Sequence, residues 1–238
     1  MCLKLLYHFW LFFVPAIAQS TIGSIFQIRA DTDFEGGCKS QLSLLDTWLS
    51  ECKALVKAAL QVFDDASSQS NPQYDIAMRY LTSYFSVTSN SEPGFTLVKS
   101  NLEAVSNFLQ GLSTIPGGTP RLWCNDKWLI KLKRTDAAFN GDSSKKLTTI
   151  KQDGSLAYVE IQDVGVYEHY LWDIQADGLK VSNGFVPYWS EDEKEYIFDS
   201  DYNGKTFCTV APGVNLGATQ EQTTRRIVTL CPDSFKNS

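Results

Sequence analysis

Five widely spaced cysteines constrain the fold of this chain more than any other feature of its sequence. They are Cys38, Cys52, Cys124, Cys208 and Cys231. No pair has the C-x-x-C spacing of a zinc or redox site, and thirteen residues separate the closest two. Widely separated cysteines in an exported chain usually form disulfides. We therefore expect a disulfide-stabilised fold in which one of the five has no partner within the chain.

The amino-terminal end predicts export. Lys4 precedes an apolar run from Leu5 to Val14, and the small-residue ending Ala16-Ile17-Ala18 follows it. This order is typical of a secretory signal peptide, and the run is shorter than the ~20 residues that a helical membrane span needs. We expect residues 1–18 to be a signal peptide and the mature chain to begin at Gln19. The product should be secreted and extracellular, with no membrane anchor.

Composition places the chain among ordinary globular proteins. It has 238 residues, of which 43% are hydrophobic and 20% charged, which is enough for one sizeable core. Lys and Arg number 21 against 27 Asp and Glu, and they are scattered along the chain. A nucleic-acid partner is therefore not expected.

Two regions differ in their patterns. Apolar residues recur every three or four positions at about 38–63, 73–85 and 96–109, which predicts three amphipathic helices. After Pro116, Asn-Gly and Asp-Gly turn dipeptides alternate with short β-rich runs, which favours antiparallel strands. Strands are expected at 121–123, 147–152, 155–161, 180–182, 196–198, 206–210 and 226–230.

These patterns predict the α+β class, with amino-terminal amphipathic helices followed by antiparallel strands. The break near Pro116 is short, so we expect one domain over residues 19–238, helical over 19–115 and strand-rich over 116–238. No internal repeat is expected.

Histidine limits the chemistry that the mature chain could perform. Loss of the leader removes Cys2 and His8 and leaves His169 as the only imidazole. A serine or cysteine nucleophile needs a base within hydrogen-bond reach, and no G-x-S-x-G turn occurs. Catalytic zinc needs three protein ligands, usually including two histidines on one helical face or histidines with a carboxylate, and one histidine cannot supply that. We expect His169 to be half-buried between tyrosines rather than catalytic, and no zinc site in this sequence.

Two acidic patterns in the sequence each allow more than one interpretation. Residues 199–204, D-S-D-Y-N-G, match the first six positions of a calcium loop, but Val210 stands where the loop needs its bidentate Glu. A solvated hairpin turn is the alternative for this stretch. Paired carboxylates ~5 to 9 Å apart could hydrolyse glycosides, and the sequence does not rank the candidates.

Tryptophans offer a related alternative, because indole rings can stack on sugars. The candidates are Trp123, Trp128, Trp172 and Trp189. In a chain with 13% aromatic residues, such side chains more often fill the core or cover disulfides.

The carboxyl-terminal end carries a family resemblance. The stretch from Thr224 to Phe235 resembles the strand-plus-cysteine segment, of the form I-x-L-C-P-x-x-F, of fungal secreted metallo-endopeptidases of the deuterolysin and lysine-specific metallo-endopeptidase-like group. Leu122-Trp123-Cys124-Asn125-Asp126 and the stretch from Tyr188 to Cys208 are similar in order. The resemblance implies a zincin-like fold with an H-E-x-x-H helix and a third, aspartate ligand.

The chain departs from this family pattern at the metal site. It contains no H-E-x-x-H, and Gly118-Thr119-Pro120-Arg121-Leu122 has leucine where the family's G-T-x-x-D segment has its aspartate ligand. The sequence ends at Ser238, where the family approaches its zinc helix, so we expect an incomplete zincin-like domain. A truncated gene model, a missed exon or a degenerate paralogue would each explain both the single histidine and the odd cysteine. No catalytic, cofactor-binding or metal-binding residue carries over, and zinc is expected only with a carboxyl-terminal continuation.

Three functional hypotheses follow. The first is a secreted metallo-endopeptidase-like protein that is inactive as written and would act on protein or peptide substrates only if complete. The second is a non-catalytic secreted module that binds a surface, a glycan or a protein. The third is a glycoside hydrolase that uses paired carboxylates.

Overall fold

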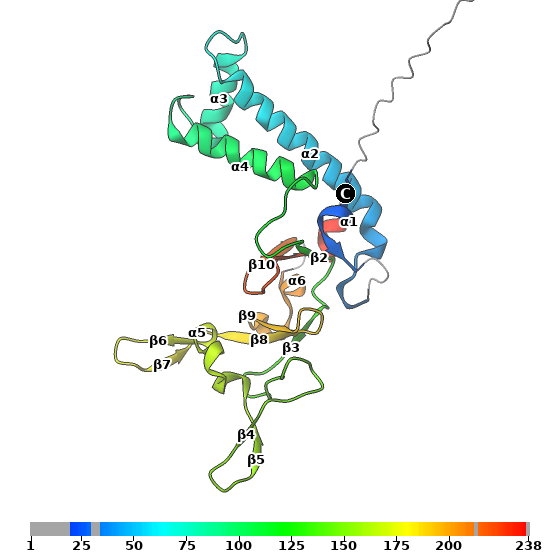
Figure 1. Ribbon diagram of the computed structural model, residues 1–238, viewed down its shortest axis with the longest axis vertical. Coiled ribbons are helices and arrows are strands. Elements are labelled where there is room, and N and C mark those ends of the chain that lie inside the picture. The colour runs from blue at the N-terminus through cyan, green and yellow to red at the C-terminus, as the bar shows by residue number, and fades with distance from the viewer. Residues whose placement is uncertain (1–19, 30–33, 212–213, 237–238) are drawn as a thin grey trace, which may run out of the picture.

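The chain adopts a mixed α+β fold, seen in a computed structural model that describes residues 20–29, 34–211 and 214–236 (Figure 1). The expected α+β class is confirmed. The signal peptide predicted for residues 1–18 lies outside the described residues and stays a prediction. None of the described helices combines the length and the apolar character that crossing a bilayer requires.

Three helices form an arm at one end of the molecule (Figure 1). They are α2 (Leu42–Asp65), α3 (Tyr74–Phe85) and α4 (Pro93–Leu109). These ranges overlap the three stretches in which apolar residues recur every three or four positions. Pro93 stands in the first turn of α4, where its fixed φ and missing N–H suit a helix start. The three helices bury a small core of their own, made of Phe63, Ala66, Ala77, Leu81, Val87 and Phe95.

The amino-terminal half of α2 belongs to a second core. Leu45 and Leu49 pack there against the short helix α1 (Ile22–Ile25) and against Leu122 of the first sheet. Helix α2 therefore packs in the core of the arm with its carboxyl-terminal half and in the core of the body with its amino-terminal half.

The first sheet has four strands in the order β1-β2-β11-β10. Their bounds are β1 (Gln27–Ile28), β2 (Arg121–Trp123), β11 (Ile227–Leu230) and β10 (Gly217–Gln220). β2 runs parallel to both β1 and β11, so the expectation of antiparallel strands was wrong for these pairs. The reason is the connections: the helical arm lies between β1 and β2, and the second sheet and both hairpins lie between β2 and β11. Each long connection returns the chain to the same end of the sheet, as a crossover does.

The second sheet is antiparallel and has the order β3-β8-β9. Its strands are β3 (Leu129–Lys131), β8 (Phe185–Ser190) and β9 (Glu195–Ser200). Tyr188 and Ile197 of this sheet pack against Trp123 and Ile227 of the first, so a common core joins the two sheets.

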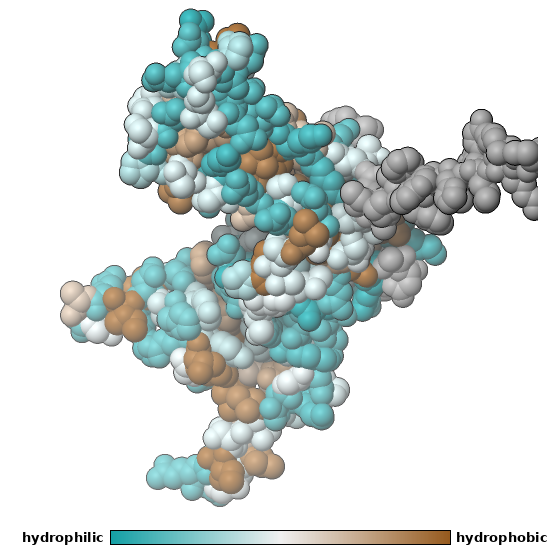
Figure 2. Space-filling model, turned by 45° about the horizontal axis from the view of Figure 1, so that its top comes forward, coloured by the Kyte–Doolittle hydropathy of each residue, from teal (hydrophilic) through white to brown (hydrophobic). Residues whose placement is uncertain are grey.

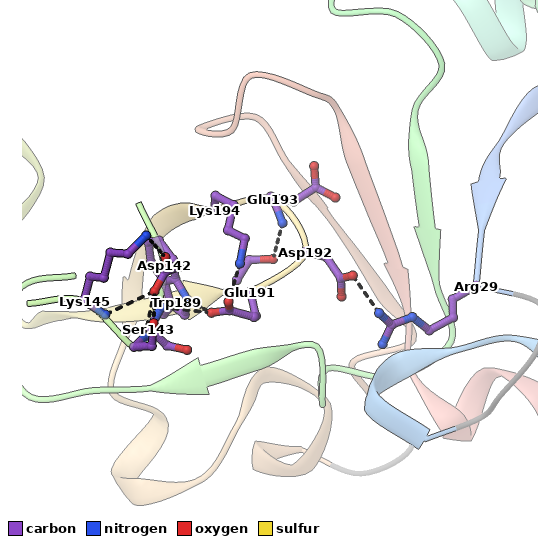
Figure 3. A network of polar contacts seen from close by, with 11 residues as sticks. Arg29, Asp142, Ser143, Lys145, Trp189, Glu191, Asp192, Glu193 and Lys194 are labelled. Carbon is purple, nitrogen blue, oxygen red and sulfur yellow. Dashed lines mark hydrogen bonds and ion pairs between the residues drawn. The ribbon is translucent and has the colours of Figure 1, made fainter. Parts of the chain in front are cut away.

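The turn between β8 and β9 ties the sheets together by charge as well (Figure 3). Arg29, after β1, contacts Asp192 at 2.7 Å. Beside it, Arg121 and Glu193 lie 3.1 Å apart, both largely buried, although they lack the alignment of a hydrogen bond. The two guanidinium groups lie 5.7 and 5.3 Å from the Trp123 ring. We call this set of contacts the sheet latch.

Two β-hairpins project from the body in different directions (Figures 1 and 2). The first pairs β4 (Thr148–Ile150) with β5 (Leu156–Tyr158), and the second pairs β6 (Trp172–Ile174) with β7 (Lys180–Ser182). The short helix α5 (Glu168–Leu171) leads into the second hairpin.

One predicted strand is wrong. Residues 206–210 form a helical turn, α6 (Phe207–Val210), in place of a strand. Thr206 and Thr209 satisfy each other's backbone N–H groups in a capping box, and a disulfide holds Cys208. Local capping and a covalent bond outweigh the β propensity of this Thr- and Val-containing stretch.

Two disulfides pair four of the five candidate cysteines. Cys38 bonds to Cys124, and Cys208 bonds to Cys231. Within the described residues Cys52 is unpaired, and it is exposed on α2 although its spacing placed it on the apolar side of the predicted helix. Disulfides are compatible with an oxidising, extracellular compartment.

Candidate functional site

The oxygens of the aspartate-rich stretch at the end of β9 have separate partners and do not gather around one point. The Asp201 carboxylate contacts the ammonium of Lys131 at 2.7 Å and also accepts a hydrogen bond from the Gly204 N–H. Asp199 accepts a hydrogen bond from the hydroxyl of Tyr202 at 2.7 Å. An ammonium group therefore already neutralises the second acidic position of the proposed calcium loop. The chain bends here into the 3-10 turn Tyr202–Gly204, which replaces the solvated hairpin turn that was the alternative.

Asp126 and Asp199 line the same small cavity between the two sheets. Its volume is about 20 Å³, which is room for about one water molecule. The Asp126 carboxylate accepts a hydrogen bond from the Cys208 N–H at 2.8 Å, so it caps α6. Burial, with the neighbouring aspartates, raises the pKa values of Tyr188 and Tyr202 beside the cavity. A sugar ring does not fit here, so this carboxylate pair gives no support to glycoside hydrolysis.

A larger groove of about 610 Å³ opens at the end of β3. Its volume falls in the range of ligand sites. The basic residues Lys131, Lys133 and Arg134 line it together with Asp136 and Asp201. We call this surface the β3 groove.

The Arg134 guanidinium of the β3 groove is fixed in place. Its Nε donates to the Phe185 carbonyl at 2.6 Å, and one terminal nitrogen donates to Asn183 Oδ1 at 3.1 Å. The guanidinium carbon lies 5.1 Å from the Trp172 ring. Burial lowers the pKa of Arg134 from its usual 12.5, yet Arg stays charged in proteins. The groove thus keeps one oriented cation.

Lys133 supplies the accessible charge. Its backbone N–H donates to Asp136 at 2.8 Å, which sets the turn after β3, while its side chain is exposed. No hydrogen bond or ion pair of the Lys133 ammonium occurs within the part of the chain that the structure describes. Sequence reasoning missed this group because it treated Lys and Arg as scattered. The run K-L-K-R at 131–134 was the available signal.

The other candidate residues lie apart from the groove or inside the protein. His169 is exposed rather than half-buried, and its ring lies 3.8 Å from that of Tyr170. Trp123, Trp128 and Trp189 are buried in the core and offer no face to a sugar. Trp172 is partly buried and faces Arg134. Among the described residues, no three His, Cys, Asp or Glu side chains gather as a metal site.

The segments that carry the family resemblance lie at the centre of the fold. Residues 227–230 form the inner strand β11, and Cys231 fixes its end to α6 through the second disulfide. Trp123 is the last residue of the neighbouring strand β2, and the disulfide-bonded Cys124 directly follows it. No protein-family model matches this chain, and no curated protein or solved structure matches it significantly.

Proposed function

We propose that this chain is an exported, zincin-like member of the metallo-endopeptidase-like group that acts by binding rather than by cleaving. We propose further that the β3 groove takes an acidic segment of another polypeptide. The observation that carries this proposal is the pairing of a fixed Arg134 guanidinium with a free Lys133 ammonium in one open groove.

Chemistry favours a carboxylate as the group that is bound. Arg and Lys are the side chains that recognise carboxylates, and Arg134 is already oriented, so little conformational entropy is lost when a ligand binds. Asp201 neutralises Lys131, which leaves Lys133 and Arg134 as the cations that face an incoming anion.

The shape of the groove favours a peptide over a sugar. The groove extends from the end of β3 past Val186 of β8 to Asp201 and Gly204, so it can take an extended segment that crosses several residues. The groove is lined by aliphatic and charged side chains and by the polar Thr135 and Gln162, and its lining includes no aromatic ring on which a sugar could stack.

Binding without cleavage agrees with the residues that the sequence supplies. A metallopeptidase of this group uses two histidines of an H-E-x-x-H helix, and residues 19–238 contain one histidine and no such motif.

The test measures binding and peptidase activity on the same exported chain. We expect poly-L-glutamate to bind with an affinity that falls as salt rises, and Lys133→Glu to weaken it about tenfold. Lys57→Glu, on the exposed side of α2, is the matched charge reversal and should leave binding unchanged.

Polygalacturonate, an acidic sugar chain, separates the two ligand classes. Binding of polygalacturonate but not of poly-L-glutamate would contradict the peptide assignment. Cleavage of a denatured protein that a chelator abolishes and zinc restores would contradict the binding-only role.

A further inference from the structure

The two projecting hairpins are copies of one local structure. Leu147, Ile150, Asp153 and Gly154 recur 24 positions later as Leu171, Ile174, Asp177 and Gly178. These shared residues give the two hairpins the same turn chemistry.

The backbone contacts of the two hairpins also match. In the first, the Lys151 N–H donates to the Ser155 carbonyl at 2.8 Å, and in the second the Gln175 N–H donates to the Leu179 carbonyl at 3.0 Å. In each turn the aspartate accepts the N–H two residues further on, at 2.9 Å in the first and 3.0 Å in the second. The two hairpins therefore have the same register.

This register leaves equivalent backbone groups unpaired at the edges. In an antiparallel pair, hydrogen-bonded positions alternate with positions whose N–H and C=O point outward. Ile150 of β4 and Ile174 of β6 occupy outward positions, and among the described strands none pairs with either hairpin as a third. Their side chains are 72% and 60% exposed. Open edges with exposed apolar side chains are surfaces that other strands can join.

The charged residues beside the two exposed isoleucines indicate which strand can pair with each open edge. Lys151 follows Ile150, and Asp173 precedes Ile174; both charges are exposed. Neither side chain forms an ion pair or hydrogen bond in the described chain. If β4 and β6 pair antiparallel with Ile150 opposite Ile174, Lys151 falls directly opposite Asp173. That register joins two outward positions by backbone hydrogen bonds and places opposite charges across the new edge.

We infer that the occupant of these edges is a second copy of this chain, with β4 of one copy paired to β6 of the other. The hairpins project in different directions within one molecule, so the contact forms between molecules (Figures 1 and 2). A two-fold dimer uses the contact twice. The contact area is small, so the association should be weak and concentration-dependent. This inference is independent of the β3 groove.

Sedimentation of the exported chain from low to high micromolar concentration tests it. Cys52→Ser serves as the background, because the exposed Cys52 thiol could otherwise link two chains covalently. We expect the mean mass to rise with concentration, and Lys151→Glu or Asp173→Lys alone to weaken association about tenfold.

Mixing the two single variants is the decisive measurement. The Lys151→Glu chain then meets the Asp173→Lys chain, every contact regains opposite charges, and association should return. Lys57→Glu is the control and should associate as the background does. Three outcomes would each overturn the inference: a monomer at all concentrations, an association that neither reversal weakens, or a weakened association that mixing does not restore.

Discussion

Gly36 lies in a corner where the Trp123 ring leaves no room for a side chain. Its φ is +97°, which favours glycine, and a Cβ there would lie 2.9 Å from Cε3 of Trp123. Trp123 is fully buried and stacks on Trp128 at 5.4 Å, so it has little freedom to move away. The residue type at position 36 is thus determined by packing across the core as well as by the backbone.

We expect Gly36→Ala to destabilise the protein by about 2–4 kcal/mol, because steric overlap adds to backbone strain. Gly118→Ala is the matched control: its φ is +86°, and nothing lies within 4 Å of its added Cβ. It should cost about 1 kcal/mol. Urea unfolding of the two variants measures the difference, and equal losses would show that packing plays no part.

Glu191 gives a prediction about pH. Hydrogen bonds from Lys194, Trp189 and Ser143 lower the pKa of this carboxyl from 4.5 to about 2. The folded state thus favours the ionised form, which stabilises the fold above pH 4.5, and this contribution disappears as the pH falls toward 2.

Glu191→Gln should therefore lower Tm at neutral pH and flatten the fall of Tm between pH 4.5 and 2. Thermal scans across this range, followed by tryptophan fluorescence, provide the measurement. Glu103→Gln, an exposed glutamate on α4, should leave the profile unchanged. A wild-type slope in the Glu191→Gln variant would refute the assignment.

At the scale of elements, the disulfides join segments that are distant in the sequence and that also pack in the core. Cys38–Cys124 joins the segment before α2 to the end of β2 across 86 positions, and Cys208–Cys231 joins α6 to the end of β11 across 23. Strands of three or four residues gain little stability from pairing alone. The two disulfides add stability mainly by lowering the conformational entropy of the unfolded chain.

The length of the loop that each disulfide closes predicts which of the two stabilises the fold more. Replacing Cys38 and Cys124 together by Ala should cost about 4.5 kcal/mol, and replacing Cys208 and Cys231 about 3.5 kcal/mol. Denaturant unfolding of the two double variants gives the comparison. A larger loss for the shorter loop would show that local strain or packing, rather than chain entropy, governs these bonds.

At the scale of the whole molecule, the sheet latch fixes how the two sheets meet. Side chains of Arg121 and Glu193 are 12% and 8% exposed, so each charge depends on the other for compensation. Removing one partner leaves a buried charge unpaired, whereas removing both leaves an apolar contact.

We expect Arg121→Met or Glu193→Leu alone to cost about 3–5 kcal/mol, and the double variant to cost less than either. A double-mutant cycle measured by urea unfolding tests this. Lys145 and Asp142, a pair in which the lysine is exposed, provide the control cycle and should show a coupling near or below 1 kcal/mol. Additive losses at Arg121 and Glu193 would show that the latch is not a coupled pair.

The sequence predicted features that depend on local periodicity and turn chemistry. Apolar spacing marked the stretches that form α2, α3 and α4, and Asp153-Gly154 marked the turn between β4 and β5. Turn and helix preferences act over a few residues, so one sequence contains them. Cysteine parity likewise indicated an unpaired thiol, but it did not identify Cys52.

Features that depend on contacts between residues far apart in the sequence became visible only in the tertiary structure. The parallel pairing of β2 with β11 places Ile227 opposite Arg121, and the Cys208–Cys231 bond and the Asp126 carboxylate both hold α6 in place. The β3 groove also arises from distance: Asn183 and Phe185 orient Arg134, and Asp201 neutralises Lys131. Charge and hydrogen-bond contacts of this kind are set by three-dimensional proximity, which no local pattern encodes.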